Sequence, residues 1–362
     1  MSRGGMNDWS SQVRRSARTA DRLAAVLSLS DDELRGIDAA RANGFPALVP
    51  PHYLSLIDPD DPADPMRIQC IPSVRETVAA PLELDDSLAE ERHTVAPDLV
   101  RRYPDRVLLL ATDRCSIHCR HCTRRRRVGR SGPRAVPSLE PAFRWIEDHR
   151  EVREVLVSGG DPLVAPDRWI EAVLRRIRRI GHVELIRVGS RVPVTMPRRV
   201  TPSLCRILRR AAPLFLTTHF NHPRELSPAA VAACDALADA GIPVANQAVL
   251  LRGVNDGAGV QAELSRALLR ARVRPYYLMQ CDAVTGTSHL RVPVRRGLEI
   301  MEALRRTTTG LGIPAYVLDL PGGAGKVVLD RSSMIRREGD ALVLRSPGGG
   351  EVRYPDPLDR CR

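Results

Sequence analysis

Beyond about residue 100, short apolar runs alternate with longer amphipathic segments. Runs such as VLLLAT (107–112) and EVLVSG (154–159) read as buried strands, whereas WIEAVLRRIRRI (169–180) has the spacing of an amphipathic helix. The pattern predicts seven strands, at 107–112, 154–159, 184–189, 214–220, 243–250, 273–280 and 314–320.

A helix is expected after each of the first six strands, at 138–149, 169–180, 202–211, 228–240, 259–270 and 296–308. Six consecutive βα units favour a parallel sheet, arranged as a full or partial barrel. A doubly wound sheet is the competing arrangement. The Gly-rich fingerprint that usually follows its first strand is missing, however, and cysteines occupy that place.

The first hundred residues read as mostly helical and irregular. Ser30-Asp31-Asp32-Glu33 resembles a capping box and predicts a helix that ends near Ala42. The Pro- and Asp-rich stretch 46–72 is predicted to be loop, with Cys70 as a packing residue. We expect this region to cover the main domain or to form an oligomer contact.

Composition narrows the class of protein. No apolar run among the 362 residues is long enough to span a membrane, and residues 1–22 lack a signal core, so we expect a cytoplasmic protein without a membrane partner. The formal net charge of +12 raises the hypothesis of a basic RNA-binding protein with a structural cluster or zinc. Because the arginines are spread along the chain without interleaved aromatics, we expect no nucleic-acid partner.

The chain contains a single lysine, Lys326, so 54 of its 55 basic residues are arginines. Arginine replaces lysine on a surface at little cost. It cannot replace an amine that condenses with a carbonyl, because the guanidinium stays protonated. A lone remaining lysine therefore hints at covalent chemistry, although chance survival is an equal alternative.

Three cysteines follow the first predicted strand at the spacing C-x3-C-x2-C, namely Cys115, Cys119 and Cys122. Three thiolates can hold three irons of a cubane cluster and leave the fourth iron open to a small molecule. Structural zinc needs four donors, and His118 or His121 could complete such a site. Spacing alone favours the open cluster but leaves zinc as an alternative.

Polar residues also end each of the other predicted strands. Because the carboxyl ends of parallel strands meet at one rim, where barrel active sites are built, these residues favour a site. They include Ser158–Asp161, Gly189–Arg191, His219–His222, Asn246, Gln247, Asp282 and Asp319.

The cysteine string CSIHCRHCTRRR resembles the lysine 2,3-aminomutase family of radical S-adenosylmethionine (SAM) enzymes. The resemblance implies a [4Fe-4S] cluster on the three cysteines and a reductant such as flavodoxin or ferredoxin. It also implies the radical SAM partial (β/α)6 TIM-like barrel over residues 99–320. A helical and irregular extension (1–98) would precede the barrel, and a lysine loop with a short tail (321–362) would follow it.

The same resemblance implies two further cofactor sites. SAM would contact the Gly-rich motif after the second strand and two later residues, together Ser158, Gly159, Gly160, Asp161, His219 and Gln247. Pyridoxal 5′-phosphate (PLP) would be held covalently by Lys326 in PGGAGK (321–326), with its phosphate on Arg102, Tyr103 and Arg106. A nucleotide-binding Walker loop is disfavoured because Val327 occupies the place of Ser or Thr.

Three residues match the positions that bind the substrate in the family. Arg124 would pair with the α-carboxylate, which a guanidinium binds bidentately. Asp282 and Asp319 would hold a cationic side chain, because two nearby carboxylates repel each other unless a cation lies between them. Either aspartate alone would read as an ordinary turn residue. Family members that act on glutamate lack both acids.

The resemblance therefore implies a 2,3-aminomutase that converts L-lysine to β-lysine. Free arginine, or a lysine on a translation factor, is the alternative substrate, although HCRHCTRR at the cluster favours a free amino acid. One departure concerns the zinc site of clostridial-type members, because Gly257 stands where they have a cysteine and the tail has only Cys361. We therefore expect no zinc, and we expect a homo-oligomer.

Overall fold

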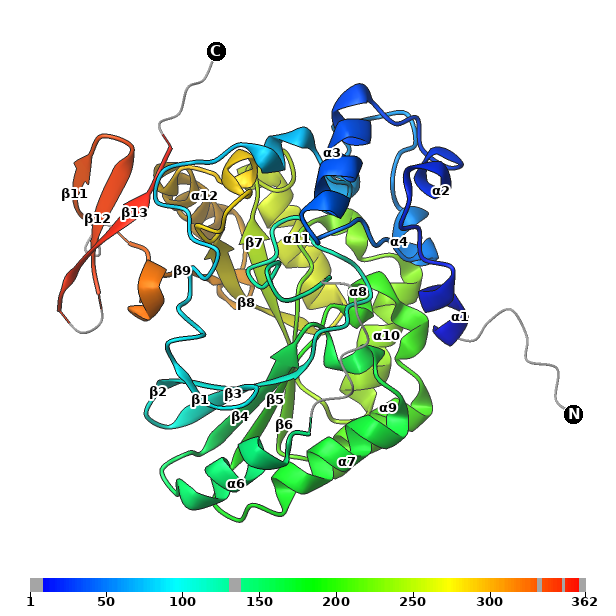
Figure 1. Ribbon diagram of the computed structural model, residues 1–362, viewed down its shortest axis with the longest axis vertical. Coiled ribbons are helices and arrows are strands. Elements are labelled where there is room, and N and C mark those ends of the chain that lie inside the picture. Colours follow the sequence, from blue (N-terminus) through cyan, green and yellow to red (C-terminus); the bar gives the residue numbers. More distant parts are fainter. Residues whose placement is uncertain (1–8, 130–137, 331–333, 347–348, 358–362) are drawn as a thin grey trace, which may run out of the picture.

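The computed structural model describes residues 9–129, 138–330, 334–346 and 349–357 (Figure 1). Its main feature is one open sheet in which ten strands follow each other in sequence order. The strands are β1 (Thr94–Ala96), β2 (Leu99–Tyr103), β3 (Arg106–Thr112), β4 (Glu154–Gly159), β5 (Leu185–Gly189), β6 (Leu214–Thr218), β7 (Val244–Leu250), β8 (Val273–Gln280), β9 (Ala315–Asp319) and β10 (Lys326–Val328).

Strands β3 to β9 are parallel, whereas β1, β2 and β10 add antiparallel strands at the two ends. The sheet does not close on itself among the described residues, so the partial barrel is confirmed. The seven strands predicted from the apolar runs are β3 to β9, with bounds shifted by at most two residues.

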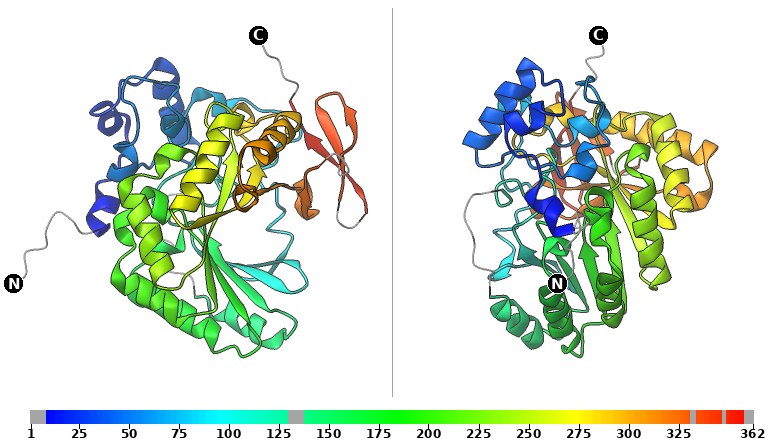
Figure 2. Two further views of the ribbon diagram at one scale, coloured as in Figure 1. Left: turned by 180° about the vertical axis from the view of Figure 1, so that it is seen from behind. Right: turned by 90° about the vertical axis from the view of Figure 1, so that its right-hand side faces the viewer.

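Helices cover the outer face of the curved sheet (Figure 2). They are α6 (Glu140–Asp148), α7 (Asp167–Arg178), α9 (Pro202–Arg210), α10 (Pro228–Asp239), α11 (Ala258–Arg270) and α12 (Val294–Thr307), close to the six predicted segments, with the short α8 (Val192–Thr195) after β5. Along β4, Val155 and Val157 are buried while Leu156 and Ser158 are partly exposed. Because side chains alternate along a strand, one face of the sheet packs on the helices and the other is left for a cavity.

The N-terminal extension contains α1 (Trp9–Arg14), α2 (Ala20–Ala24) and α3 (Asp31–Ala42). The predicted capping box of α3 is present, since Ser30 and Glu33 cap each other's backbone N–H groups. The prediction that 46–72 is all loop was wrong, because α4 (Pro51–Leu54) and α5 (Pro65–Ile68) lie within it. Proline at the first position of each helix, and Asp64 as the cap of α5, explain these short turns.

The chain ends in a separate antiparallel sheet of β11 (Met334–Glu338), β12 (Ala341–Arg345) and β13 (Glu351–Pro355), which lies beside α12 (Figure 1). Tyr354 is buried and donates its hydroxyl to the carbonyl of Cys281 (2.8 Å). Asp356 accepts from the backbone N–H of Val294 (2.6 Å). No helix in the described part of the chain is long and apolar enough to cross a membrane.

Candidate active site

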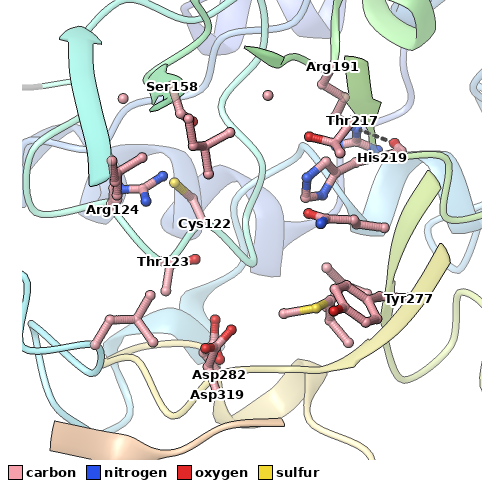
Figure 3. A pocket seen from close by; sticks show the side chains of 18 of the residues that line it. Cys122, Thr123, Arg124, Ser158, Arg191, Thr217, His219, Tyr277, Asp282 and Asp319 are labelled. Atoms are coloured by element: carbon pink, nitrogen blue, oxygen red, sulfur yellow. Dashed lines mark hydrogen bonds between the residues drawn. The ribbon is translucent and has the colours of Figure 1, made fainter. Parts of the chain in front are cut away.

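A cavity of about 560 Å³ lies against the uncovered face of the sheet, at the carboxyl ends of β3 to β9 (Figure 3). Asn246 and residues 220–222 of the predicted polar rim do not line this cavity. Its walls include every residue that the resemblance assigns to a cofactor or to the substrate, although these residues are scattered over more than 220 positions of the chain. They are Arg102, Tyr103, Arg106, Cys115, Cys119, Cys122, Arg124, Ser158, Gly159, Gly160, Asp161, His219, Gln247, Asp282, Asp319 and Lys326.

The N-terminal extension clamps the cysteine loop from outside the sheet. The backbone N–H of His118 donates to Leu48 O (3.0 Å), and its ring Nδ1 lies 2.7 Å from Pro46 O. The Arg120 side chain is fully buried and pairs with Glu76 (2.6 Å). The extension therefore covers the main domain at the cysteine loop, as one of the two expectations proposed.

The three cysteines of the loop are free thiols that line the cavity. Burial, and then the nearby charge of Cys119, raise the pKa of Cys122 to about 11, and burial also raises the pKa of Cys115. These two thiols therefore give up their protons to a metal rather than to water. No group of three or more His, Cys, Asp or Glu in the described chain is gathered closely enough for a single metal ion. A cubane takes a different thiolate on each iron, so its ligands surround a volume, and this donor set suits it.

The two histidines of the loop differ in position. His118 stacks on Phe45 at 5.1 Å between ring centroids and is held by the Pro46 carbonyl, and it is not among the residues that line the cavity. His121 lines the cavity, and its buried Nδ1 has no hydrogen-bond partner among the described residues. Of the two loop histidines, His121 is therefore the one that lies on the cavity side as a possible fourth donor for the zinc alternative.

The glycines after β4 are required by a close approach to the cysteine loop. A Cβ on Gly159 would lie 2.4 Å from Thr112 O, and one on Gly160 would lie 2.3 Å from Arg114 O. The backbone N–H of Asp161 donates to Arg114 O (2.7 Å). The motif therefore fastens the strand end to the residue that precedes Cys115.

The Asp161 carboxylate is used inside the protein. It accepts from Ser190 Oγ (2.7 Å) and from the backbone N–H groups of Arg191 (2.8 Å) and Leu163 (3.1 Å). This side chain ties the ends of β4 and β5 together.

Lys326 and Asp319 face each other across the antiparallel pair of β9 and β10. Lys326 Nζ lies 2.5 Å from Asp319 Oδ2, and Arg102 reaches Asp319 Oδ1 at 3.4 Å. The backbone N–H of Lys326 donates to the Tyr103 hydroxyl (3.1 Å). The lysine is thus held at the cavity wall beside the predicted phosphate clamp.

The clamp itself lies on the β2–β3 hairpin. The guanidinium groups of Arg102 and Arg106 lie over the Tyr103 ring, 5.8 and 4.9 Å from its centroid. Arg102 Nε is buried without a hydrogen-bond partner among the described residues. A buried donor without a partner is costly, so the hairpin suits an anionic group such as a phosphate.

Asp282 lies next to Asp319 at the floor of the cavity (Figure 3). Its Oδ1 is buried and has no partner in the described chain. Burial, and then the charge of Asp319, raise the pKa of Asp282 to about 7. The neighbouring carboxyl groups of Asp282 and Asp319 therefore suit a cation between them.

Arg124 also lines the cavity, where it is paired with Glu90. Its Nη2 lies 2.7 Å from Glu90 Oε1, and Glu90 is buried. The neighbouring Arg125, Arg126 and Arg127 are partly buried and pair with Glu76, Asp86, Asp98 and Asp113. Three of these four carboxylates belong to the extension and draw the arginines toward it.

Sequence reasoning missed several residues of the cavity wall. Glu90 lies in an irregular segment that has no motif, so nothing in the sequence pointed to it. Arg191 was part of the set of residues at strand ends, but its contact with Cys119 could not be foreseen. Tyr276 and Tyr277 of β8, whose rings stack at 3.8 Å, also line the cavity.

The chain is similar to known proteins along nearly its whole length. The family model of the Radical SAM superfamily matches residues 109–261, and that of Lysine-2,3-aminomutase matches residues 301–362. The L-lysine 2,3-aminomutase of Clostridium subterminale is 44% identical, over 98% of this chain and 85% of the relative. That of Fusobacterium nucleatum is 43% identical, over 97% and 83%. The glutamate 2,3-aminomutase of Clostridioides difficile is 37% identical, over 98% and 84%.

Fold, cysteine motif and superfamily match thus define a radical SAM protein, a class that implies a [4Fe-4S] cluster and SAM. Within that class, the chain belongs to the lysine 2,3-aminomutase family. It is a radical SAM aminomutase and therefore an isomerase, which confirms the resemblance stated from the cysteine string.

Proposed function

We propose that this aminomutase moves the α-amino group of free L-lysine to the β-carbon and so forms β-lysine. The observation that carries the proposal is the ion pair of Lys326 with Asp319, next to the unpartnered carboxylate of Asp282. A primary ammonium already occupies this place. The ε-ammonium of a substrate can take it over, with Asp282 as a second acceptor.

The other end of a lysine substrate also has a stand-in within the protein. Glu90 holds Arg124 with a carboxylate, as the α-carboxylate of an amino acid would. Two resident groups of the right charges thus line the same cavity. An acidic side chain in the place of the ε-ammonium would face two carboxylates, which disfavours glutamate.

The residues present also suit PLP. Lys326 supplies the only side-chain amine of the chain, and Arg102, Tyr103 and Arg106 form the anion site beside it. When bound, PLP supplies a carbonyl that takes up an amine and a conjugated ring that spreads an unpaired electron. The protein would fix the phosphate and orient the lysine amine.

SAM would lie between the cluster loop and the rim residues. Ser158, Gly159, Gly160, His219 and Gln247 line this side of the cavity. Burial, and then the charges of Arg191 and Arg124, lower the pKa of His219 to about 4, so its imidazole is neutral at physiological pH. A neutral imidazole can donate one hydrogen bond to a nucleoside and accept another from it.

The function is tested by anaerobic reconstitution with iron, sulfide, SAM, PLP and a reductant, followed by incubation with L-lysine, L-arginine or L-glutamate in separate vessels. We expect a product of unchanged mass from lysine that co-elutes with authentic β-lysine. Rearrangement of arginine at a higher kcat/KM than lysine would overturn the substrate and favour the arginine alternative. Activity only on a lysine within a folded translation factor would overturn it as well.

A further inference from the structure

Arg191 places a permanent positive charge against one of the three cluster cysteines. It follows β5, its guanidinium is 7% exposed, and its Nη1 lies 2.8 Å from Cys119 Sγ. Nε donates to the carbonyl of His219 (3.1 Å). The guanidinium has no other protonation state in a protein, so this charge does not vary with pH.

The remaining donors of Arg191 are held by buried acceptors. Nη2 donates to Glu225 Oε1 (2.6 Å) and to Gln69 Oε1 (2.6 Å), and it also contacts the Tyr53 hydroxyl at 3.3 Å. These contacts fix the group in one orientation, with Nη1 directed at the sulfur.

Glu225 is fully buried, and its carboxylate accepts hydrogen bonds from other groups besides Arg191. It accepts from the Tyr53 hydroxyl (2.7 Å) and from the backbone N–H groups of Asn221 (2.5 Å) and His222 (3.1 Å). Three donors besides the guanidinium keep the carboxylate satisfied. The pair therefore offers two opposite charges at different distances from Cys119, with the positive one in contact.

We propose that Arg191 is a positioning residue that raises the reduction potential of the cluster through its N–H···S contact with Cys119, and that Glu225 offsets part of this effect. The inference rests on the cluster of the proposed function. Reduction adds negative charge to the cluster and its sulfurs, so a donor and a cation at a ligand sulfur favour the reduced form. A buried carboxylate close behind the cation opposes it.

The same contacts give the N-terminal extension an influence on the cluster. Tyr53 lies on α4 and Gln69 is the C-cap of α5, and both hold Arg191 or its partner. Gln69 O also accepts from the backbone N–H of Arg120 in the cysteine loop (2.8 Å). The extension therefore both orients the Arg191 guanidinium and anchors the cysteine loop.

The test is a redox titration of the reconstituted holoenzyme, followed by electron paramagnetic resonance, without SAM. At the midpoint potential of the wild type, Arg191→Gln should lower the ratio of reduced to oxidised cluster about tenfold, which is a shift of about 59 mV for one electron. Glu225→Gln should shift the midpoint in the opposite direction. Arg199→Gln is the control, because Arg199 is equally buried but pairs with Asp167 and should leave the midpoint unchanged.

Opposite shifts with an unchanged control support the inference, because loss of folding alone cannot move two midpoints in opposite directions. Equal midpoints in all variants overturn it, and so does a shift that occurs only when SAM is present. If Arg191→Gln fails to retain iron, the midpoint potential of Glu225→Gln decides between the outcomes. A higher midpoint than in the wild type supports the inference, and an equal one overturns it. A wild type without a cubane spectrum would overturn the proposed function and this inference together, whereas a normal spectrum with unmoved variants overturns this inference alone.

Discussion

Charged side chains in the cavity are paired with one another where a substrate would bring its own charges. Lys326 neutralises Asp319 and Glu90 neutralises Arg124, whereas Asp282 Oδ1 has no hydrogen-bond partner in the part of the chain that the structure describes. A substrate that carries an ammonium at one end and a carboxylate at the other can exchange for both resident partners. Binding then replaces ion pairs rather than creating buried charges, which limits the desolvation cost.

The role of Lys326 is tested by Lys326→Arg. The variant keeps the charge opposite Asp319 but cannot form an imine. We expect its turnover to fall to that of protein without PLP, and borohydride reduction to leave no covalent label. In the wild type the label should map to Lys326. Rearrangement by the variant at the wild-type rate would contradict the proposal.

Asp282→Asn should lower lysine turnover while iron content and PLP binding stay unchanged. Loss of one charged hydrogen bond in a closed site costs about 2–5 kcal/mol, or roughly 30- to several-thousand-fold in rate. Asp239→Asn is the control, because the Asp239 side chain is 70% exposed in its pair with Arg272. The substrate assignment would be wrong if both variants processed lysine equally well.

Asp282→Asn should lower turnover but raise the free energy of unfolding of the apo protein at high pH. Between about pH 4 and 7 the unfolded chain has lost the Asp282 proton and the folded chain has kept it, because the folded pKa is raised to about 7. The free energy of unfolding therefore falls as the pH rises through this window. We expect apo Asp282→Asn to be more stable than the wild type at pH 8, by up to about 4 kcal/mol. Denaturation at pH 5 and pH 8 checks this, and a difference that does not grow with pH would contradict it.

At the residue scale, the sequence was informative where chemistry restricts the residue type. Three cysteines, one lysine and glycines at a strand end could each be singled out without a structure. Glu90 and Arg191 could not, because any buried ion pair uses the same residue types and only the fold brings the partners together. The unpaired Asp282 Oδ1 is likewise a property of the packed cavity.

Elements of the extension and of the sheet meet at the cysteine loop. The extension supplies carbonyl and carboxylate partners to the loop, and the end of β4 supplies two glycines that lie against it. The loop has no regular secondary structure of its own. Its conformation therefore depends on both neighbours, and each contact can be tested separately.

Glu76→Gln should loosen the loop from the side of the extension. Removing one partner of a buried pair typically costs about 3–5 kcal/mol, and here Arg120 would stay buried with its charge only partly satisfied. We expect a lower melting temperature and loss of iron on gel filtration. Glu302→Gln breaks an exposed pair with Arg306 and should cost at most about 1 kcal/mol. Equal effects of Glu76→Gln and Glu302→Gln would contradict the conclusion that the extension holds the cysteine loop in place.

Gly160→Ala should disturb the loop from the side of the sheet. The added Cβ would meet Arg114 O at 2.3 Å, so the backbone before Cys115 has to move. Such overpacking typically costs about 1–3 kcal/mol, and we expect lower iron retention and weaker SAM binding. A Cβ at Gly181 would meet nothing within 4 Å, so Gly181→Ala is the matched control. Normal cluster content in Gly160→Ala would argue against this contact.

At the element scale, apolar periodicity predicted the strands and helices of the core well because both are long and regularly patterned. It did not predict β1, β2 and β10, which are only three to five residues long and lie at or next to the edges of the sheet. It also missed α4 and α5, whose four residues are too few to show a helical period. Proline at the first position favours both helices, and Asp64 caps α5.

For the whole molecule, the open sheet explains how one chain can offer room for the cluster and SAM of its class and for the proposed PLP and substrate. Seven parallel strands direct their carboxyl ends to one rim, and the missing closure leaves space for a cavity of about 560 Å³. The extension closes the rim beside the cysteines, and Tyr354 of the C-terminal sheet supports the backbone before Asp282. The fold class and the rim could be predicted from sequence, whereas these outer supports required the tertiary structure.

The central claim is an intramolecular shift of nitrogen from C2 to C3 of lysine, and isotope tracing tests it most directly. L-lysine labelled with ¹⁵N at the α-amino group and ¹³C at C3 is incubated with the reconstituted enzyme, and ¹³C spectra are recorded. We predict that a one-bond ¹⁵N–¹³C coupling develops at C3 in the wild type and is absent with Lys326→Arg. A product without that coupling, or a lysine that remains unchanged while the cluster, SAM and PLP are all bound, would contradict the account.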